Sequence, residues 1–117
     1  MRLACRWLVA ALAWAWMAFA IADVAVPPLS GAVVDLTATL SAEQRNTLEG
    51  ELRSFAERRG SQVAVLLVPT TQPETIEQFG IRVADQWKIG RKSIDDGAIV
   101  IVAKNDRTVR IEVGYGL

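Results

Sequence analysis

The spacing of apolar residues predicts a first helix over residues 41–60. Ser41 and Gln44 have the spacing of a capping box, in which each side chain binds the backbone amide of the other residue. Gly60 supplies the left-handed conformation that commonly ends a helix. The residues at helical spacing, expected to form one buried stripe, are Leu48, Leu52, Phe55 and Ala56.

Two longer apolar runs predict strands. Residues 62–68 and 98–103 are almost continuously apolar, which is typical of strands covered on both faces. Between them Pro73 opens a second helix that extends to Ile89. Strand, helix and strand together form a βαβ unit. The stripe of this second helix, which we assign to the core, consists of Ile76, Phe79, Val83, Ala84 and Trp87.

The strict alternation of residues 108–113 predicts a returning strand. Its Val109, Ile111 and Val113 are expected to face inward, and residues 104–107 form the tight turn before it. Residues 32–36 are either a further short strand or a lead-in. The expected fold is therefore α/β: a three-layer, sandwich-like domain whose mixed sheet combines the βαβ unit with an antiparallel hairpin, with helices on the faces. Because a domain that ends on an uncovered hairpin strand exposes an edge, we expect its C-terminal part to be missing from this sequence.

The first 22 residues have the order of a secretory signal peptide. Arg2 and Arg6 precede an apolar run, and small residues follow at Ala18, Ala20 and Ala22. The alternative, an uncleaved anchor, needs about 20 apolar residues, whereas the stretch from residue 7 to 22 has 16. We therefore expect an exported protein, periplasmic or on the outer face of the cytoplasmic membrane. Residues 23–31 form a proline-containing linker, and residues 32–117 form the domain.

Composition excludes several classes of function. The chain has no histidine, and its one cysteine, Cys5, lies in the leader, so imidazole-based zinc sites and Ser/His/Asp or Cys/His catalysis are excluded from the exported domain. Without the two leader arginines, 11 basic groups face 13 acidic ones. This slightly acidic balance and the scattered basic residues argue against a nucleic-acid partner.

Several short motifs in order resemble the TPM domain family. They are Val34-Asp35, Trp87-Lys88-Ile89-Gly90, Asp95-Asp96-Gly97, Asp106-Arg107 and the stretch from Arg110 to Leu117. The family includes thylakoid-lumen proteins of photosystem II repair, a modulator of acetylcholine receptors and many exported bacterial proteins. The resemblance implies a membrane protein complex as partner and a membrane anchor in the missing C-terminal part. Phosphatase activity and a bound divalent cation are also implied by some members.

The candidate site residues are acidic, with one arginine. Asp95 and Asp96 offer hard oxygen ligands for calcium or magnesium, or else form an ordinary turn before Gly97. Asp35 joins this metal site or fixes the local backbone by accepting amide hydrogen bonds. Arg107 grips a phosphate or lies solvated in the hairpin turn. The rule that ligands gather beyond the carboxyl ends of parallel strands favours residues 69–71 and 105–107 instead.

Two functions follow as hypotheses. The first is an exported module, without catalysis, that assists the assembly, maintenance or regulation of membrane protein complexes. The alternative is a divalent-metal-dependent phosphatase that acts on phosphomonoesters outside the cytoplasm. In that alternative Asp95 and Asp96 hold the ion, and Arg107 steadies the developing charge.

Overall fold

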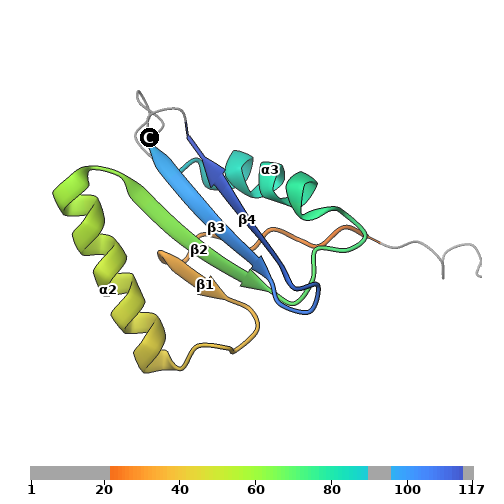
Figure 1. The fold of residues 1–117 in the computed structure, drawn as a ribbon, viewed down its shortest axis with the longest axis horizontal. Coiled ribbons are helices and arrows are strands. Elements are labelled where there is room, and N and C mark those ends of the chain that lie inside the picture. Colours follow the sequence, from red (N-terminus) through yellow and green to blue (C-terminus); the bar gives the residue numbers. More distant parts are fainter. Residues whose placement is uncertain (1–21, 90–95, 115–117) are drawn as a thin grey trace, which may run out of the picture.

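The described part of the domain is a four-stranded sheet with two helices (Figure 1). The computed structural model describes residues 22–89 and 96–114. The elements in chain order are β1 (Val33–Asp35), α2 (Ala42–Arg59), β2 (Gln62–Val68), α3 (Ile76–Trp87), β3 (Gly97–Ala103) and β4 (Thr108–Val113). The signal peptide predicted over residues 1–22 lies almost entirely outside the described residues.

The strands lie in the order β1-β2-β3-β4. β1 runs parallel to β2, with Val33 beside Val65, and β2 runs parallel to β3, with Gln62 beside Gly97. β4 returns antiparallel to β3. The predicted α/β fold, with its mixed sheet, βαβ unit and antiparallel hairpin, is therefore confirmed, and residues 33–35 are a strand.

Helix α2 has the predicted ends but less burial than predicted. Ser41 and Gln44 form the capping box in both directions, and Gly60 takes a left-handed φ of 74°. The stripe of Leu48, Leu52, Phe55 and Ala56 is only half-buried, and no residue of α2 is fully buried. α2 lies along the β1 side of the sheet, where Glu49 accepts a hydrogen bond from the amide of Val33 at 3.4 Å. The helix therefore packs along β1 and β2 without contributing a fully buried side chain.

Helix α3 builds the core. It begins after Thr75, whose hydroxyl accepts a hydrogen bond from the amide of Gln78, and its Phe79, Val83 and Trp87 are buried. These side chains pack against alternate residues of the sheet, namely Val34, Ala64, Leu66, Val68, Ile99, Ile101 and Ala103. The predicted assignment of this stripe to the core is confirmed, because the partly buried Ile76 and Ala84 also pack against the core.

The segment before β1 packs against the same core. Val24 and Val26 contact it, and the carbonyl oxygens of Val24 and Pro27 accept hydrogen bonds from Arg82 and Trp87 at 2.7 and 2.8 Å. Residues 22–32 have no regular secondary structure. The predicted linker is thus extended, yet it is held along α3 rather than free of the domain.

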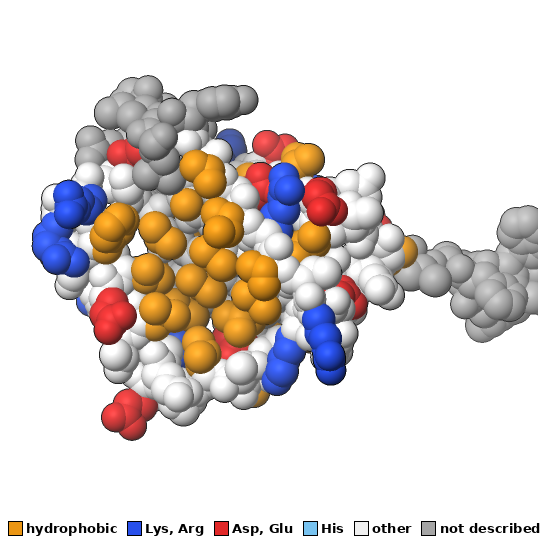
Figure 2. All heavy atoms as spheres, viewed as in Figure 1, with side chains coloured by type: hydrophobic (Ala, Val, Ile, Leu, Met, Phe, Trp, Pro, Cys, Tyr) orange, Lys and Arg blue, Asp and Glu red, His pale blue; other side chains and the backbone are white. Residues whose placement is uncertain are grey.

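Within the described residues, the opposite face of the sheet is open over part of its area, although Val33 and Leu67 on this face are buried. Val63, Val65, Val100 and Val102 point to this face and are only half-buried, although β2 and β3 were predicted to be covered on both sides. Figure 2 shows hydrophobic side chains gathered over the sheet in the view of Figure 1, in which α3 lies behind it. Within residues 22–89 and 96–114, no helix is long and apolar enough to cross a membrane.

The orientation of the hairpin strand is the reverse of the prediction. Val109, Ile111 and Val113 lie on the open face and are 63%, 58% and 60% exposed. Arg110 and Glu112 instead point to the side of α3 and are half-buried. Their partners in β3 are Ile101 and Ile99, which face α3, so this register forces the polar side chains of β4 inward.

Candidate functional site

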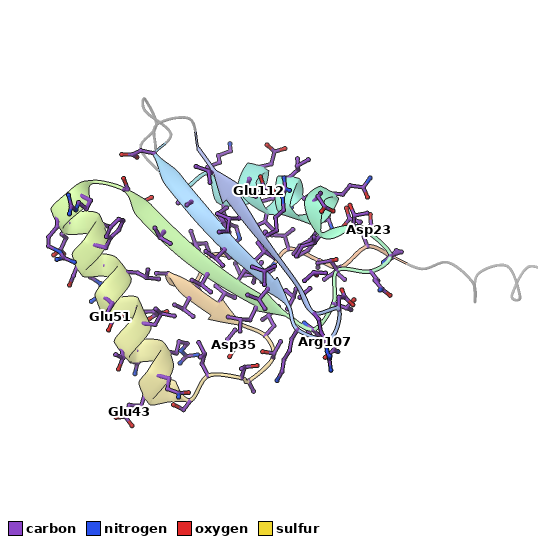
Figure 3. The ribbon with its side chains drawn as sticks, viewed as in Figure 1. Asp23, Asp35, Glu43, Glu51, Arg107 and Glu112 are labelled. Carbon is purple, nitrogen blue, oxygen red and sulfur yellow. The ribbon has the colours of Figure 1, made fainter. Side chains whose placement is uncertain are left out.

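Polar side chains gather where the strands reach one end of the sheet. Asp35 ends β1, Thr70 and Thr71 follow β2, and Asp106 and Arg107 form the turn between β3 and β4. Figure 3 shows Asp35 and Arg107 at this end. The carboxyl ends of parallel strands are where open α/β sheets usually bind ligands, and residues 69–71 and 105–107 had been favoured on that ground.

Asp35 organises the loop between β1 and α2. Its carboxylate accepts hydrogen bonds from the amides of Thr37 and Leu40, both at 2.8 Å, and from the hydroxyl of Thr37. Burial raises the pKa of Asp35, but the hydrogen bonds from Leu40 and Thr37 outweigh burial, so the pKa lies below its ordinary value of 3.8. The geometry matches the backbone-fixing alternative, while a metal-binding role for Asp35 stays a prediction.

The lowered pKa of Asp35 predicts a pH dependence of stability. A carboxyl whose pKa is lower in the folded state stabilises the fold above its unfolded-state pKa and loses that contribution as the pH falls through the folded-state value. We expect the Asp35→Asn variant to be less stable than the wild type by an amount that is constant near neutral pH and shrinks below about pH 4. Urea unfolding over a pH series measures this difference. Glu57→Gln, at an exposed position of α2, is the control. A stability difference that does not change with pH would contradict the assignment.

Asp106 joins the ends of β2 and β3. Its carboxylate accepts the hydroxyl of Thr70 at 2.8 and 2.9 Å and the amide of Thr71 at 3.1 Å. Two backbone bonds, from Lys104 to Val68 and from Asn105 to Pro69, hold the same loops together. The Asp106 carboxylate therefore holds the loops after β2 and β3 together, at the end of the sheet where a ligand would approach.

Arg107 lies in the turn between β3 and β4, at the same end of the sheet. Its backbone is left-handed, with φ of 54°, and its amide donates to the carbonyl oxygen of Lys104 at 3.3 Å. The side chain is exposed. Such a guanidinium can meet an anion from solution, and its predicted role toward phosphate remains a prediction.

The acidic motif lies at the other end of the sheet. Asp96 is buried and immediately precedes β3, while Asp95 lies outside the described residues. The seven residues of β3 separate Asp96 from the turn that carries Arg107, a distance of about 20 Å. Asp35 is also remote from Asp96, because it pairs with Leu67 near the opposite end of β2. The structure therefore does not bring Asp96 together with Asp35 or Arg107 in one site.

Hard-metal coordination was expected at the acidic residues. A calcium or magnesium site normally takes several oxygen ligands. Among residues 22–89 and 96–114, no three Asp or Glu side chains lie close enough together to hold an ion. A divalent cation therefore stays a prediction that depends on Asp95.

A match over most of the sequence shows the family of this chain. The sequence model of the TPM domain matches residues 33–117. This chain belongs to the TPM domain family. The predicted resemblance is thus confirmed over β1 to β4, and the TPM domain begins at the first strand of the sheet.

Two solved structures share the TPM fold described above. The N-terminal domain of a protein from P. gingivalis is 29% identical with a TM-score of 0.70, and covers 79% of this chain and 62% of its own. The N-terminal domain of a protein from Corynebacterium glutamicum is 13% identical with a TM-score of 0.64, covers 83% and 64%, and supports the fold alone. This TPM domain therefore spans somewhat less than two thirds of either neighbour. A comparison with curated proteins gave no match.

Sequence reasoning missed two features of this TPM domain. Glu49 lies outside the apolar stripe predicted for its helix, yet it is half-buried and its carboxylate binds the backbone amide of Val33 at the free edge of β1. In addition, β2 and β3 were predicted to be covered on both faces, whereas one face of the sheet is largely open in the described residues. A useful signal was available for the second feature. β3 carries small or β-branched apolar residues on both faces, whereas of the two described helices only α3 has side chains that are buried.

Proposed function

We propose that this TPM domain is an interaction module, without catalysis, that works outside the cytoplasm and assists the assembly, maintenance or regulation of a membrane protein complex. The observation that carries the proposal is the apolar face of the sheet that the described residues leave open. A module of this kind needs a rigid surface more than it needs reactive side chains.

The open face is suited to binding a protein. It runs across three strands, from Val63 and Val65 on β2, through Val100 and Val102 on β3, to the exposed side chains of β4. Figure 2 shows it as a continuous hydrophobic area, with arginines, lysines and acidic side chains around it. Contiguous apolar surfaces of this kind on soluble domains commonly mark interaction sites. The partner we propose is an apolar extracytoplasmic surface of a membrane protein.

Catalysis is the less favoured function. The phosphatase alternative requires Asp95 and Asp96 to hold an ion while Arg107 contacts the same phosphoryl group. Asp96 and Arg107 lie at opposite ends of β3, which argues against one shared substrate. Two side chains that often act as nucleophile or base are also lacking, because the sequence has no histidine and its one cysteine, Cys5, lies in the predicted leader.

Photo-crosslinking tests the proposed function directly. A photoreactive amino acid at Val100, in the centre of the open face, is expected to form covalent adducts with an integral membrane protein of the cell envelope. The same group at Gln86, an exposed position on α3, is the matched control and is expected to form none. Equal adducts from both positions, or none from Val100 in folded protein, would contradict the proposal.

A further inference from the structure

Residues 23–28, which precede β1 without regular secondary structure, form a strap along the core. Val24 and Val26 are half-buried and pack against the core, whereas Ala25 between them is exposed. This alternation is typical of an extended segment that lays one side on a protein surface. The strap is therefore part of the folded domain, although the match to the TPM domain begins only at Val33.

The first anchor of the strap is Arg82 on α3. Its guanidinium donates a hydrogen bond to the carbonyl oxygen of Val24 at 2.7 Å, and its Nε donates to both oxygens of the Glu74 carboxylate at 3.0 and 3.2 Å. Asp23 lines the same surface hollow as these two charged side chains, and Figure 3 shows it near the start of α3. Hydrogen bonds from a charged donor are roughly twice as strong as neutral ones. This end of the strap is therefore firmly held.

The second anchor of the strap is Trp87, at the end of α3. Its indole N–H donates a hydrogen bond to the carbonyl oxygen of Pro27 at 2.8 Å. The Trp87 side chain is buried, and an indole has only this one donor. Release of the strap removes the partner of a buried donor, which is unfavourable. The two anchors thus oppose the opening of the strap near both of its ends.

The strap begins where the predicted leader ends. A signal peptidase is expected to cut the peptide bond between Ala22 and Asp23, and the anchored Val24 is the second residue after that bond. Two extended residues span at most about 7 Å, which is less than the diameter of about 10 Å of one helix with its side chains. A protease must enclose the chain on both sides of the bond that it cuts. The peptidase therefore has no room at this bond while Val24 is held against α3.

We propose that the strap and the signal peptidase compete for the same residues, so that removal of the leader precedes the docking of the strap. Cleavage adds water to the bond, leaving a carboxylate on Ala22 and an ammonium group on Asp23. The peptidase acts on the fraction of chains whose strap is open, and the contacts of Arg82 and Trp87 keep that fraction small. This inference rests on the export that is part of the proposed function.

Cleavage of the full-length chain tests the competition. The chain is purified in detergent micelles and incubated with a purified signal peptidase, and mass spectrometry follows the appearance of the product that begins at Asp23. Arg82→Gln removes the charged hydrogen bond to Val24, which normally favours the bonded state by a factor of about ten or more. We therefore expect this variant to be cut about tenfold faster than the wild type.

Arg110→Gln is the matched control. The side chain of Arg110 is 39% exposed, against 34% for Arg82, and it likewise pairs with a glutamate, Glu112, but this pair lies within β4. Its loss is expected to leave the rate of cleavage unchanged. Circular dichroism shows that both variants are folded, and urea unfolding compares their stabilities. Equal acceleration in the two variants would mean that general destabilisation exposes the bond, and it would overturn the proposal.

Trp87→Phe tests the second anchor independently of Arg82. Phenylalanine keeps an aromatic ring in the core but lacks the N–H that binds Pro27, so cleavage is expected to be several-fold faster than in the wild type. A wild-type chain that is cut as fast as folded Arg82→Gln and Trp87→Phe would overturn this inference alone. A leader that the peptidase removes from none of the three chains would overturn the proposed export as well.

Discussion

Replacing Phe79 by alanine is expected to lower the free energy of unfolding by about 3–5 kcal/mol. Phe79 is the largest of the fully buried side chains, and it lies in the core between α3 and the sheet. Its removal loses the transfer free energy of the ring and leaves a cavity that neighbours fill only partly. Domains of this size are stable by about 5–15 kcal/mol, so the loss is a large part of the total. Urea unfolding followed by circular dichroism measures it.

Val109→Ala is the matched control for this prediction. Val109 is apolar and belongs to the same sheet, but it lies on the open face and is 63% exposed. Its truncation is expected to cost less than about 1 kcal/mol, within the range of strand propensity. Similar losses for the two variants would mean that the open face is buried in solution. The two variants together therefore test whether the apolar core lies on only one face of the sheet.

The elements of the fold could be predicted because their signals are local. The capping box at Ser41, the left-handed Gly60 and the helical spacing of Phe79, Val83 and Trp87 depend on residues a few positions apart. The parallel pairing of β2 with β3 follows from the intervening helix, because a parallel connection needs a long crossover. These features give the α/β class and the order of the elements.

The faces of the elements could not be predicted in the same way. The alternation of β4 shows that its two faces differ, but which face points inward depends on its register with β3 and on the side that α3 covers. Both faces of β3 are apolar, so the sequence of β3 does not distinguish them. Gly80 on α3 lies against the Glu112 side chain, which gives that carboxylate space beside the helix. Contacts between residues far apart in the sequence therefore decide which face of β4 points inward.

The candidate site was predictable in part for the same reason. The rule of strand ends predicts that residues 69–71 and 105–107 lie together, and Thr70 does contact Asp106 there. The acidic motif drew attention because adjacent carboxylates resemble a metal site, whatever their place in the sheet. The strand predicted over residues 98–103 already implies that Asp96 and Arg107 lie at opposite ends of β3, and the structure shows this separation.

The glycine of the Asp95-Asp96-Gly97 motif has a structural explanation. A Cβ atom placed on Gly97 would lie 2.8 Å from the backbone carbonyl carbon and oxygen of Ile89, and 2.6 Å from its side chain. Backbone atoms cannot move aside as a flexible side chain can. The start of β3 and the end of α3 therefore approach each other closely only because residue 97 has no side chain. This contact also fixes the position of Asp96, which immediately precedes it.

Gly97→Ala is accordingly expected to destabilise the domain by about 1–3 kcal/mol, the usual range for overpacking. Gly50→Ala is the control: no atom lies within 4 Å of its added Cβ, and Gly50 lies inside α2, so alanine is expected to stabilise the domain by about 0.5–1 kcal/mol. Thermal unfolding of the two variants should thus show midpoint shifts of opposite sign. If Gly97→Ala kept wild-type stability while Gly50→Ala raised it, the close approach at Ile89 would be wrong. The glycine of the acidic motif would then need a ligand, rather than packing, to explain it.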